Sequence, residues 1–156
     1  MISDDREGHG MQPRHPDFRQ AVASLFDTPG FIKDVDIRFV DCGPGWCTTR
    51  LDLSPRHLQH TGVVHAGVSA TMADHSAGGA AMSLLDAGQV PVTVEFKIQL
   101  LRAASGSHLE CRGEVLTLGA RLIAAEATVY AVDGAARVMV AKLISTLAPV
   151  AAFSSA

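Results

Sequence analysis

A lone acidic residue in the middle of the sequence has the clearest potential for chemistry. Asp74 lies in a run of small and apolar residues that extends from His65 to Leu85. Carboxylates buried among such neighbours are rare and cluster at functional sites, where they act as nucleophiles or general bases. A solvated charge on an amphipathic helix is the alternative that the pattern leaves open.

The start of the same run offers a second chemical group, the backbone N–H donors of a helix terminus. His65, Ala66 and Gly67 open the predicted helix, and the first N–H groups of a helix are unpaired and lie at the positive end of its dipole. Such donors stabilise an oxyanion and typically contribute about 10² to 10³ in rate. Helical spacing places Gly67 and Asp74 on one face, so both groups can line one groove. His65 suits either a hydrogen bond at the helix entry or proton transfer.

Histidine and cysteine spacing does not predict a metal centre. His57 and His60 precede His65, but no cysteine or second carboxylate completes a ligand set. The three cysteines are odd in number and have no repeated spacing, so we expect reduced thiols rather than a disulfide framework. They are Cys42, Cys47 and Cys111. Neither a metal nor a cofactor is therefore expected.

Length and composition limit the class of protein. The chain has 156 residues, of which 47% are hydrophobic and 5% aromatic, and its formal net charge is -3. This size fits one domain with a core of aliphatic side chains, and the charge argues against a nucleic-acid partner. The N-terminus has no apolar signal core, and no stretch of about 20 residues is apolar enough for a membrane span. We expect a soluble, cytoplasmic protein without membrane contact.

Apolar periodicity predicts the elements that would hold these residues. A short helix is predicted over 17–26, and the alanine-rich run 65–85 predicts a long helix of about five turns. Alternating apolar residues predict strands, and Asp133-Gly134 is typical of a hairpin turn. The predicted strands cover 31–40, 46–53, 90–101, 108–115, 121–132 and 136–147.

This order predicts an α+β domain in which a curved, mainly antiparallel sheet of five to six strands wraps around one long central helix. The domain is expected over residues 16–148, with a flexible leader at 1–15 and a flexible tail at 149–156. Strand 90–101 alternates apolar and polar residues, so one of its faces would cover the helix. Apolar residues on the other sheet face would also need cover, which points to an oligomer.

The segment from Gln59 to Gly67, followed by Asp74, resembles the signature of hotdog-fold thioesterases. It is most similar to the phenylacetate-pathway type, a branch near the 4-hydroxybenzoyl-CoA thioesterases. The run from Thr93 to Arg102 also resembles the strand that follows the central helix in that family. The resemblance covers most of the chain. It implies a hotdog fold and the hydrolysis of an acyl-CoA thioester with an aryl or medium-chain acyl group.

The resemblance implies a role for each matched residue. Asp74 matches the nucleophile or general base. The backbone N–H groups of Ala66 and of the residue that follows it would polarise the thioester carbonyl. Gln59 would place the carbonyl or the attacking water, Thr93 would hold that water, and His65 would organise the loop. In this family the site lies between subunits. Asp74 of one copy would therefore face Gln59 and Ala66 of another, in a homotetramer built as a dimer of dimers.

The sequence departs from the family pattern at two places. The motif His-Gly-Gly reads His65-Ala66-Gly67 here, which keeps the N–H donor. The run Arg-Pro-Ala reads Arg102-Ala-Ala, which we expect to alter a turn more than the chemistry. Coenzyme A is part of the expected substrate, and its phosphates require cations. The candidate residues are Lys97, Arg102 and Arg121.

Two other functions fit the same fold. A hotdog module that binds acyl-CoA without hydrolysis would not need Asp74. A hotdog hydratase or dehydratase would pair a histidine with a carboxylate in a different motif, which we do not find in the sequence. An ordinary structural role for Thr93 in its strand is the alternative to water binding.

Overall fold

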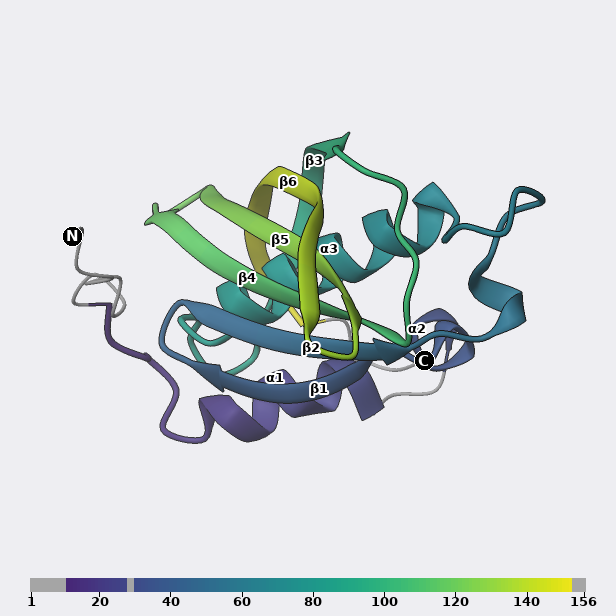
Figure 1. Cartoon of the computed structure of the whole chain (residues 1–156). Coiled ribbons are helices and arrows are strands. Elements are labelled where there is room, and N and C mark those ends of the chain that lie inside the picture. The colour runs from purple at the N-terminus through teal and green to yellow at the C-terminus, as the bar shows by residue number, and fades with distance from the viewer. Residues whose placement is uncertain (1–10, 28–29, 153–156) are drawn as a thin grey trace, which may run out of the picture.

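The structure, a computed structural model, describes residues 11–27 and 30–152 of the chain. Short helices lead into a hairpin, a long helix follows, and four long strands complete the described part (Figure 1). In chain order the elements are α1 (Phe18–Asp27), α2 (Phe31–Val35), β1 (Arg38–Gly43), β2 (Trp46–Asp52), the 3-10 turn η1 (Pro55–His57), α3 (Ala66–Met82), β3 (Gln89–Leu100), β4 (His108–Leu118), β5 (Ile123–Asp133) and β6 (Ala136–Ala151).

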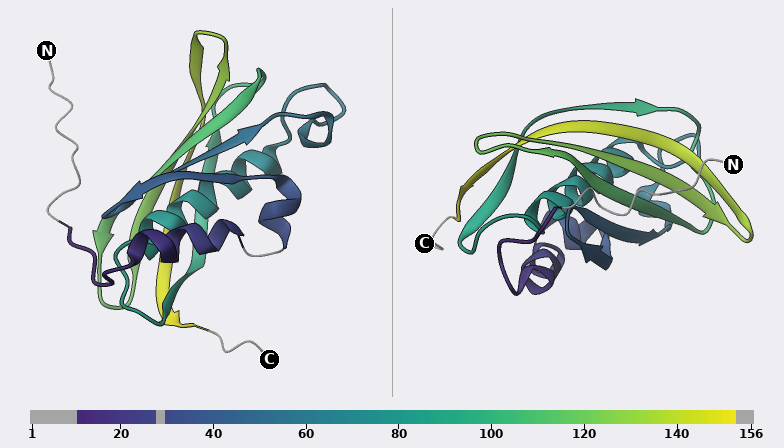
Figure 2. Two further views of the ribbon diagram at one scale, coloured as in Figure 1. Left: turned by 90° about the horizontal axis from the view of Figure 1, so that it is seen from below. Right: turned by 90° about the vertical axis from the view of Figure 1, so that its left-hand side faces the viewer.

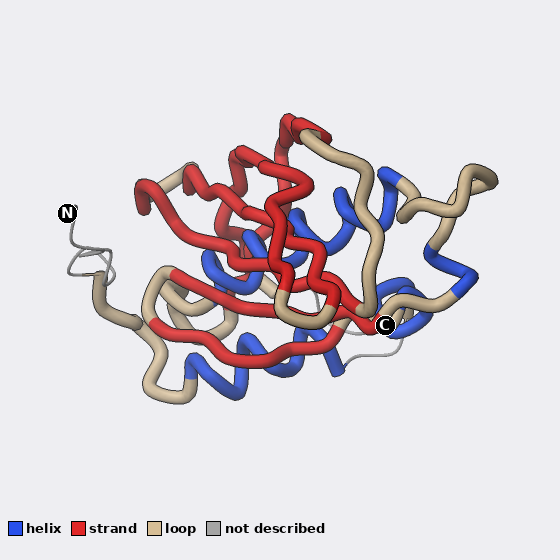
Figure 3. The backbone as a smooth tube through the Cα atoms, in the orientation of Figure 1, coloured by secondary structure: helices blue, strands red, loops and turns tan. Residues whose placement is uncertain are grey.

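One six-stranded sheet curves around α3 (Figures 1 and 2). Its order is β1-β2-β4-β5-β6-β3, and every neighbouring pair is antiparallel. The tube drawn in Figure 3 shows α3 lying across the concave side of the strands. The predicted α+β arrangement is therefore confirmed, with six strands. Among the described residues, no helix is both long and apolar enough to cross a membrane.

Glycines let α3 lie close to the sheet. A Cβ at Gly113 of β4 would overlap the backbone carbonyl of Ser76, and a Cβ at Gly79 of α3 would lie 2.8 Å from the Cys47 sulfur. Either overlap would push the helix away from the strands. The Ser76 and Thr49 hydroxyls also bond across this contact at 2.8 Å. Gly79, which weakens helix propensity, therefore serves the packing of α3 against the sheet.

Helix α1 covers one side of α3. Its Phe26 ring meets the His75 ring edge-on, with the centroids 4.6 Å apart. The His75 Nε2–H donates to the Leu25 carbonyl oxygen over 3.1 Å. Burial lowers the pKa of His75, because the charged imidazolium would lose its hydration there. A neutral imidazole thus fastens the end of α1 to α3, next to Asp74.

Two element boundaries differ from those predicted. Residues 31–40, predicted as one strand, form α2 and the beginning of β1. Asp36 ends α2 in the left-handed conformation, with φ 67°, and its N–H bonds to the carbonyls of Ile32 and Lys33. Ile32 and Val35 have the i, i+3 spacing of a helix, whereas Val35, Ile37 and Phe39 alternate as in a strand. The apolar pattern alone therefore could not place the boundary.

The end of the domain also lies further along the chain than predicted. β6 pairs with β3 as far as Ala151, so residues 149–151 are strand rather than flexible tail. Of the predicted leader, residues 1–10 lie outside the described part, as do 28–29 and 153–156. Residue Arg14, also within the predicted leader, forms an ion pair with Asp86 at 3.5 Å.

The sheet face that points away from α3 is mainly polar, contrary to the expectation of an apolar second face. Ion pairs lie on this face, such as Lys142 of β6 with Glu126 of β5 at 2.6 Å, and Arg112 with Glu114 of the same strand, β4, at 3.0 Å. Of the thirteen large apolar side chains that are exposed in the described part of the chain, five lie along the edge strand β3 and just beyond it. They are Val92, Val94, Phe96, Leu100 and Leu101.

Strand β3 contains an irregularity that decides which side chains face α3. Thr93 lies opposite Leu147 of β6, and Phe96 lies opposite Ser145, with a register shift between Thr93 and Glu95. Leu147 and Ser145 are both buried under the helix. Thr93 and Phe96 therefore share the helix-facing side, although simple alternation would place them on opposite faces.

Candidate active site at the start of α3 and the adjacent strand

Asp74 and Thr93, predicted as site residues from different elements, meet in the structure. Asp74 lies about two turns into α3 and is half-buried. The Thr93 hydroxyl, on the helix-facing side of β3, donates to Asp74 Oδ1 over 2.9 Å. The other carboxylate oxygen, Oδ2, has no such bond from the described residues. The carboxylate is thus oriented by one neighbour and retains an oxygen for a water or a substrate.

The first turn of α3 leaves one of the two predicted backbone donors unused. His65 caps the helix, and its Nδ1 accepts the N–H of Gly67 over 2.9 Å. The Val68 N–H bonds to the His65 carbonyl. Within the described residues, the N–H of Ala66 has no hydrogen-bond partner. In this conformation the donor for an oxyanion is therefore Ala66, and the expected second donor at Gly67 is occupied by the imidazole.

A cavity of about 370 Å³ lies beside this helix start. Gln59, Ala66 and Arg102 line it, so three of the predicted residues meet in one place. The Arg102 guanidinium donates to the Met139 carbonyl over 3.1 Å, which fixes its direction. The Gln59 amide N–H donates to the Thr61 hydroxyl over 2.8 Å, within its own loop.

The two halves of the predicted site are separated within one chain. Ala66 and Asp74 are eight residues apart on the same helix, which corresponds to about 12 Å along its axis. A carbonyl that accepts a hydrogen bond from Ala66 must lie within about 3 Å of that N–H. Asp74 of the same chain therefore cannot reach the carbon of that carbonyl.

The other two predicted cations lie elsewhere. Lys97 pairs in register with Ile144, which is 57% exposed, so Lys97 points to the sheet face away from α3. Arg121 is exposed in the turn before β5, whose first residue pairs with Leu147. Arg102 follows the opposite end of β3. Within one chain, only Arg102 of the three joins Gln59 and Ala66.

Sequence reasoning missed the structural importance of His57. This residue is 2% exposed. Its Nδ1 accepts the Ser54 N–H over 3.1 Å, and its Nε2–H donates to the Val35 carbonyl over 2.9 Å. It therefore locks η1, which precedes the Gln59 loop, against the end of α2. Ser54-Pro55 is a helix-start signal that could have revealed this turn.

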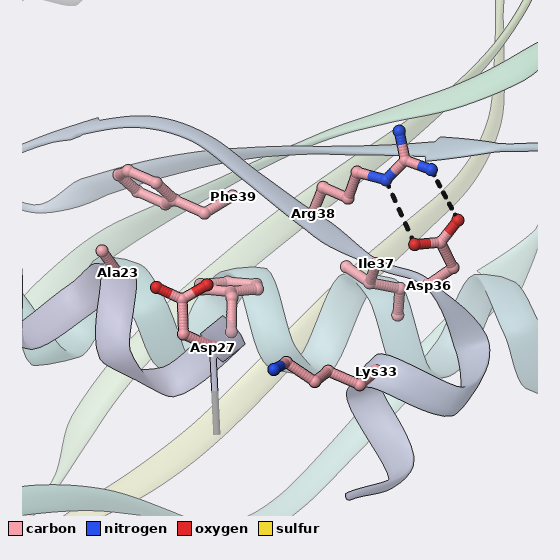
Figure 4. A pocket seen from close by; sticks show the side chains of 8 residues that line it. Ala23, Asp27, Lys33, Asp36, Ile37, Arg38 and Phe39 are labelled. Atoms are coloured by element: carbon pink, nitrogen blue, oxygen red, sulfur yellow. Dashed lines mark hydrogen bonds and ion pairs between the residues drawn. The ribbon is translucent and has the colours of Figure 1, made fainter. Parts of the chain in front are cut away.

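A second hollow, of about 490 Å³, lies between α1, α2 and β1 (Figure 4). Arg38 pairs with Asp36 there, and Lys33 extends toward the side where Asp27 lies. Two acidic and two basic side chains line it, so its charges balance and favour neither an anion nor a cation. It is formed by different elements from those that carry Asp74 and Ala66.

Neither metal-ligand groups nor reactive thiols add to the site. In the described part of the chain, no group of three His, Cys, Asp or Glu residues could hold a metal ion. The three cysteines are buried and free. Burial raises the pKa of Cys111 to about 12, and it also raises that of Cys47, so their thiols are poor nucleophiles at neutral pH.

Comparison with known proteins places this geometry in a family. Residues 61–137 match the family model described as "Thioesterase superfamily". The chain is also 33% identical over 114 residues to the Mycobacterium tuberculosis protein named "Putative esterase Rv1847", covering 71% of this chain and 79% of that protein. The chain belongs to the thioesterase superfamily. The matched segment begins just before His65 and includes Asp74 and Thr93.

Solved structures of similar proteins have the same fold. A thioesterase family protein from Silicibacter pomeroyi superposes with a TM-score of 0.82 and 29% identity, over 85% of this chain and 98% of that one. A Bacillus halodurans protein solved with CoA superposes with a TM-score of 0.62 and 25% identity, over 65% of this chain and 70% of that one. The hotdog fold is therefore confirmed, and the family is one of hydrolases that act on thioesters.

Proposed function

We propose that this protein hydrolyses acyl-CoA thioesters, with Asp74 as the nucleophile or general base. The observation that carries the proposal is the hydrogen bond from Thr93 to the half-buried Asp74. A thioester needs an activated water or nucleophile and a donor for the developing oxyanion. Asp74 supplies the first, and the unpaired N–H of Ala66 at the positive end of α3 supplies the second.

A second copy of the chain completes the proposed site. Asp74 and Ala66 of one chain are too far apart to act on one carbonyl, so one of them must come from another subunit. The edge strand β3 has an unpaired side and carries exposed apolar residues, such as Val94 at 61% and Leu100 at 53%. Such an edge favours pairing with another strand. Asp74 of one subunit then faces Gln59 and Ala66 of its partner.

The proposed substrate carries coenzyme A and an aryl or medium-chain acyl group. The similar Bacillus halodurans protein has been solved with CoA, which supports this carrier. Arg102 lies in the cavity beside Ala66 and offers a cation to the CoA phosphates. The exposed apolar side chains of β3 offer a surface for the acyl group. Dimers pair further into a tetramer in this proposal.

A panel of aryl- and acyl-CoA substrates, assayed with a thiol reagent, tests the proposal. The buried cysteines have raised pKa values, so the protein itself contributes little background. We expect release of CoA by the wild type, and loss of at least about 10² in kcat for Asp74→Asn. The matched control Asp86→Asn changes an exposed carboxylate beyond the other end of α3 and should keep wild-type kcat.

Other outcomes would select the competing functions. Saturable acyl-CoA binding without CoA release, unaffected by Asp74→Asn, would identify a binding module. Hydration of crotonyl-CoA without CoA release would identify a hydratase. Equal CoA release by wild type and Asp74→Asn on every substrate would remove Asp74 from the mechanism.

A further inference from the structure

Ser145 is the unusual residue on the covered face of the sheet. It lies on β6, is 2% exposed, and its hydroxyl oxygen has no hydrogen-bond partner among the described residues. No other buried side-chain nitrogen or oxygen in that part of the chain lacks a partner. A buried hydroxyl without a partner is costly, so a partner outside the protein chain is expected.

The neighbours of Ser145 within the sheet, on the covered face, are mainly apolar. Phe96 on β3 and Ala125 on β5 lie directly opposite it in the two ladders. Leu143 and Leu147, the next helix-facing residues on β6, are fully buried. The next helix-facing residue along β3, opposite Leu147, is Thr93. Among the opposite and diagonal neighbours of Ser145 on this face, Thr93 is the polar one.

Thr93 and Ser145 are diagonal neighbours on adjacent strands. Such neighbours have Cβ atoms up to about 7–8 Å apart, too far for a direct bond between short side chains. One water molecule spans roughly 5 Å between two oxygen atoms, since each hydrogen bond is about 2.7 Å long. The Thr93 hydroxyl gives its only hydrogen to Asp74, so its lone pairs are available to accept from a water.

We propose that Ser145 is a positioning residue that holds a buried water against the Thr93 hydroxyl and so aims that hydroxyl at Asp74. Ser145 donates to the water, the water donates to Thr93 Oγ1, and Thr93 donates to Asp74 Oδ1. These three hydrogen bonds all donate in the same direction, from Ser145 toward Asp74, and together they fix the rotamer of Thr93. Its effect on catalysis rests on the proposed thioesterase function, but the water itself does not.

A high-resolution crystal structure tests the proposal without any assay. The wild type should contain a buried water within hydrogen-bond distance of both Ser145 Oγ and Thr93 Oγ1. The variant Ser145→Ala should lack that water and show Thr93 in more than one rotamer. A wild-type structure in which Ser145 bonds to anything else, or to nothing, overturns the proposal whether or not the protein hydrolyses thioesters.

Kinetics of matched variants test the role in catalysis. Ser145→Ala should lower kcat about fivefold to tenfold at unchanged KM, and shift the acidic limb of the pH–rate profile, while leaving thermal stability equal or higher. The control Ser76→Ala removes a buried hydroxyl that is partnered by Thr49, so it should lower stability and keep kcat.

A double-mutant cycle separates this role from a general effect on packing. Thr93→Val should lower kcat at least as much as Ser145→Ala. The double variant should be no worse than Thr93→Val alone, because Ser145 acts through Thr93. Additive losses, or a Ser145→Ala enzyme with wild-type kcat and pH profile, contradict the positioning role. Failure of the wild type on every thioester would instead count against the proposed function, and the crystal structures would still decide whether the water is present.

Discussion

Ala66 occupies the first helical position of α3, where a proline is sterically accepted. The preceding residue, His65, already has the extended conformation that a following proline demands, with φ -64° and ψ 137°. Ala66→Pro therefore removes the N–H without breaking the helix. We expect a loss of about 10² to 10³ in kcat, measured with the best thioester of the panel. Melting temperature should stay close to that of the wild type.

The control for this variant is Ala66→Gly, which restores the family motif and keeps the donor. It should hydrolyse thioesters at close to the wild-type rate. If Ala66→Pro did the same, the oxyanion donor would have to be another group. Gly67 is the nearest candidate, and it would first have to release its N–H from His65.

Individual site residues could be predicted where they belong to a sequence motif. They could not be predicted where their role depends on the conformation of a side chain or on a distant contact. Asp74 and Thr93 were both predicted, and the structure joins them. The use of the Gly67 N–H by the His65 ring depends on a side-chain rotamer, which no spacing encodes. The roles of His57 and Ser145 depend on contacts with residues far away in the chain. The distant partner of His57 is the carbonyl of Val35.

At the scale of elements, the contact of α1 with α3 should make stability depend on pH. His75 has a lowered pKa in the folded protein, whereas an unfolded histidine titrates near about 6.5. Below that pH the unfolded chain binds a proton that the folded chain does not, so the free energy of unfolding falls as pH falls. The slope approaches about 1.4 kcal/mol per pH unit for one proton.

Denaturant titrations between pH 7 and pH 5 measure this slope. His75→Gln keeps an N–H for the Leu25 carbonyl but has no titrating ring, so its stability should depend less on pH than that of the wild type. The matched variant at the exposed His60, His60→Gln, should retain the wild-type dependence. Equal slopes for all three proteins would place the acid sensitivity elsewhere.

Most elements could be predicted because their apolar periods are long and regular. The central helix and the last four strands were found from the sequence within a few residues at most boundaries. The prediction of one strand over 31–40 was wrong because the apolar residues of this segment include both helical and strand-like spacings. The left-handed conformation of Asp36, which ends α2, has no clear sequence signal. The end of β6 was missed because its pairing partner, the start of β3, is distant in sequence.

At the scale of the whole molecule, a site shared by two subunits should allow inactive chains to rescue each other. Asp74→Asn retains Ala66, and Ala66→Pro retains Asp74. A dimer with one chain of each kind has one site in which both groups are intact. Random mixing of equal amounts should therefore restore about a quarter of the wild-type activity. Co-expression with two affinity tags allows the mixed dimer to be purified, and this species, with one of its two sites intact, should show about half of the wild-type activity.

Each variant alone, and a mixture of two Asp74→Asn preparations with different tags, serves as the control. All should be nearly inactive. No recovery in the purified mixed dimer would show that both groups act from the same chain, which the separation along α3 argues against. An oligomer could be proposed from the sequence, but the reason given for it, an apolar outer sheet face, is wrong. That face carries ion pairs, and the edge strand β3 holds several of the exposed apolar residues.

The register shift in β3 has a consequence for how the family's chains vary in length. Val94 is the extra residue at this shift, and its side chain is 61% exposed. A related protein without a residue at this position would still present the threonine and the phenylalanine to the helix, because the pleat would then alternate regularly. Gain or loss of a residue further along β3 would exchange its two faces. Position 94 is therefore a place inside a strand where evolution can insert or delete one residue and leave Thr93 on the face that meets Asp74.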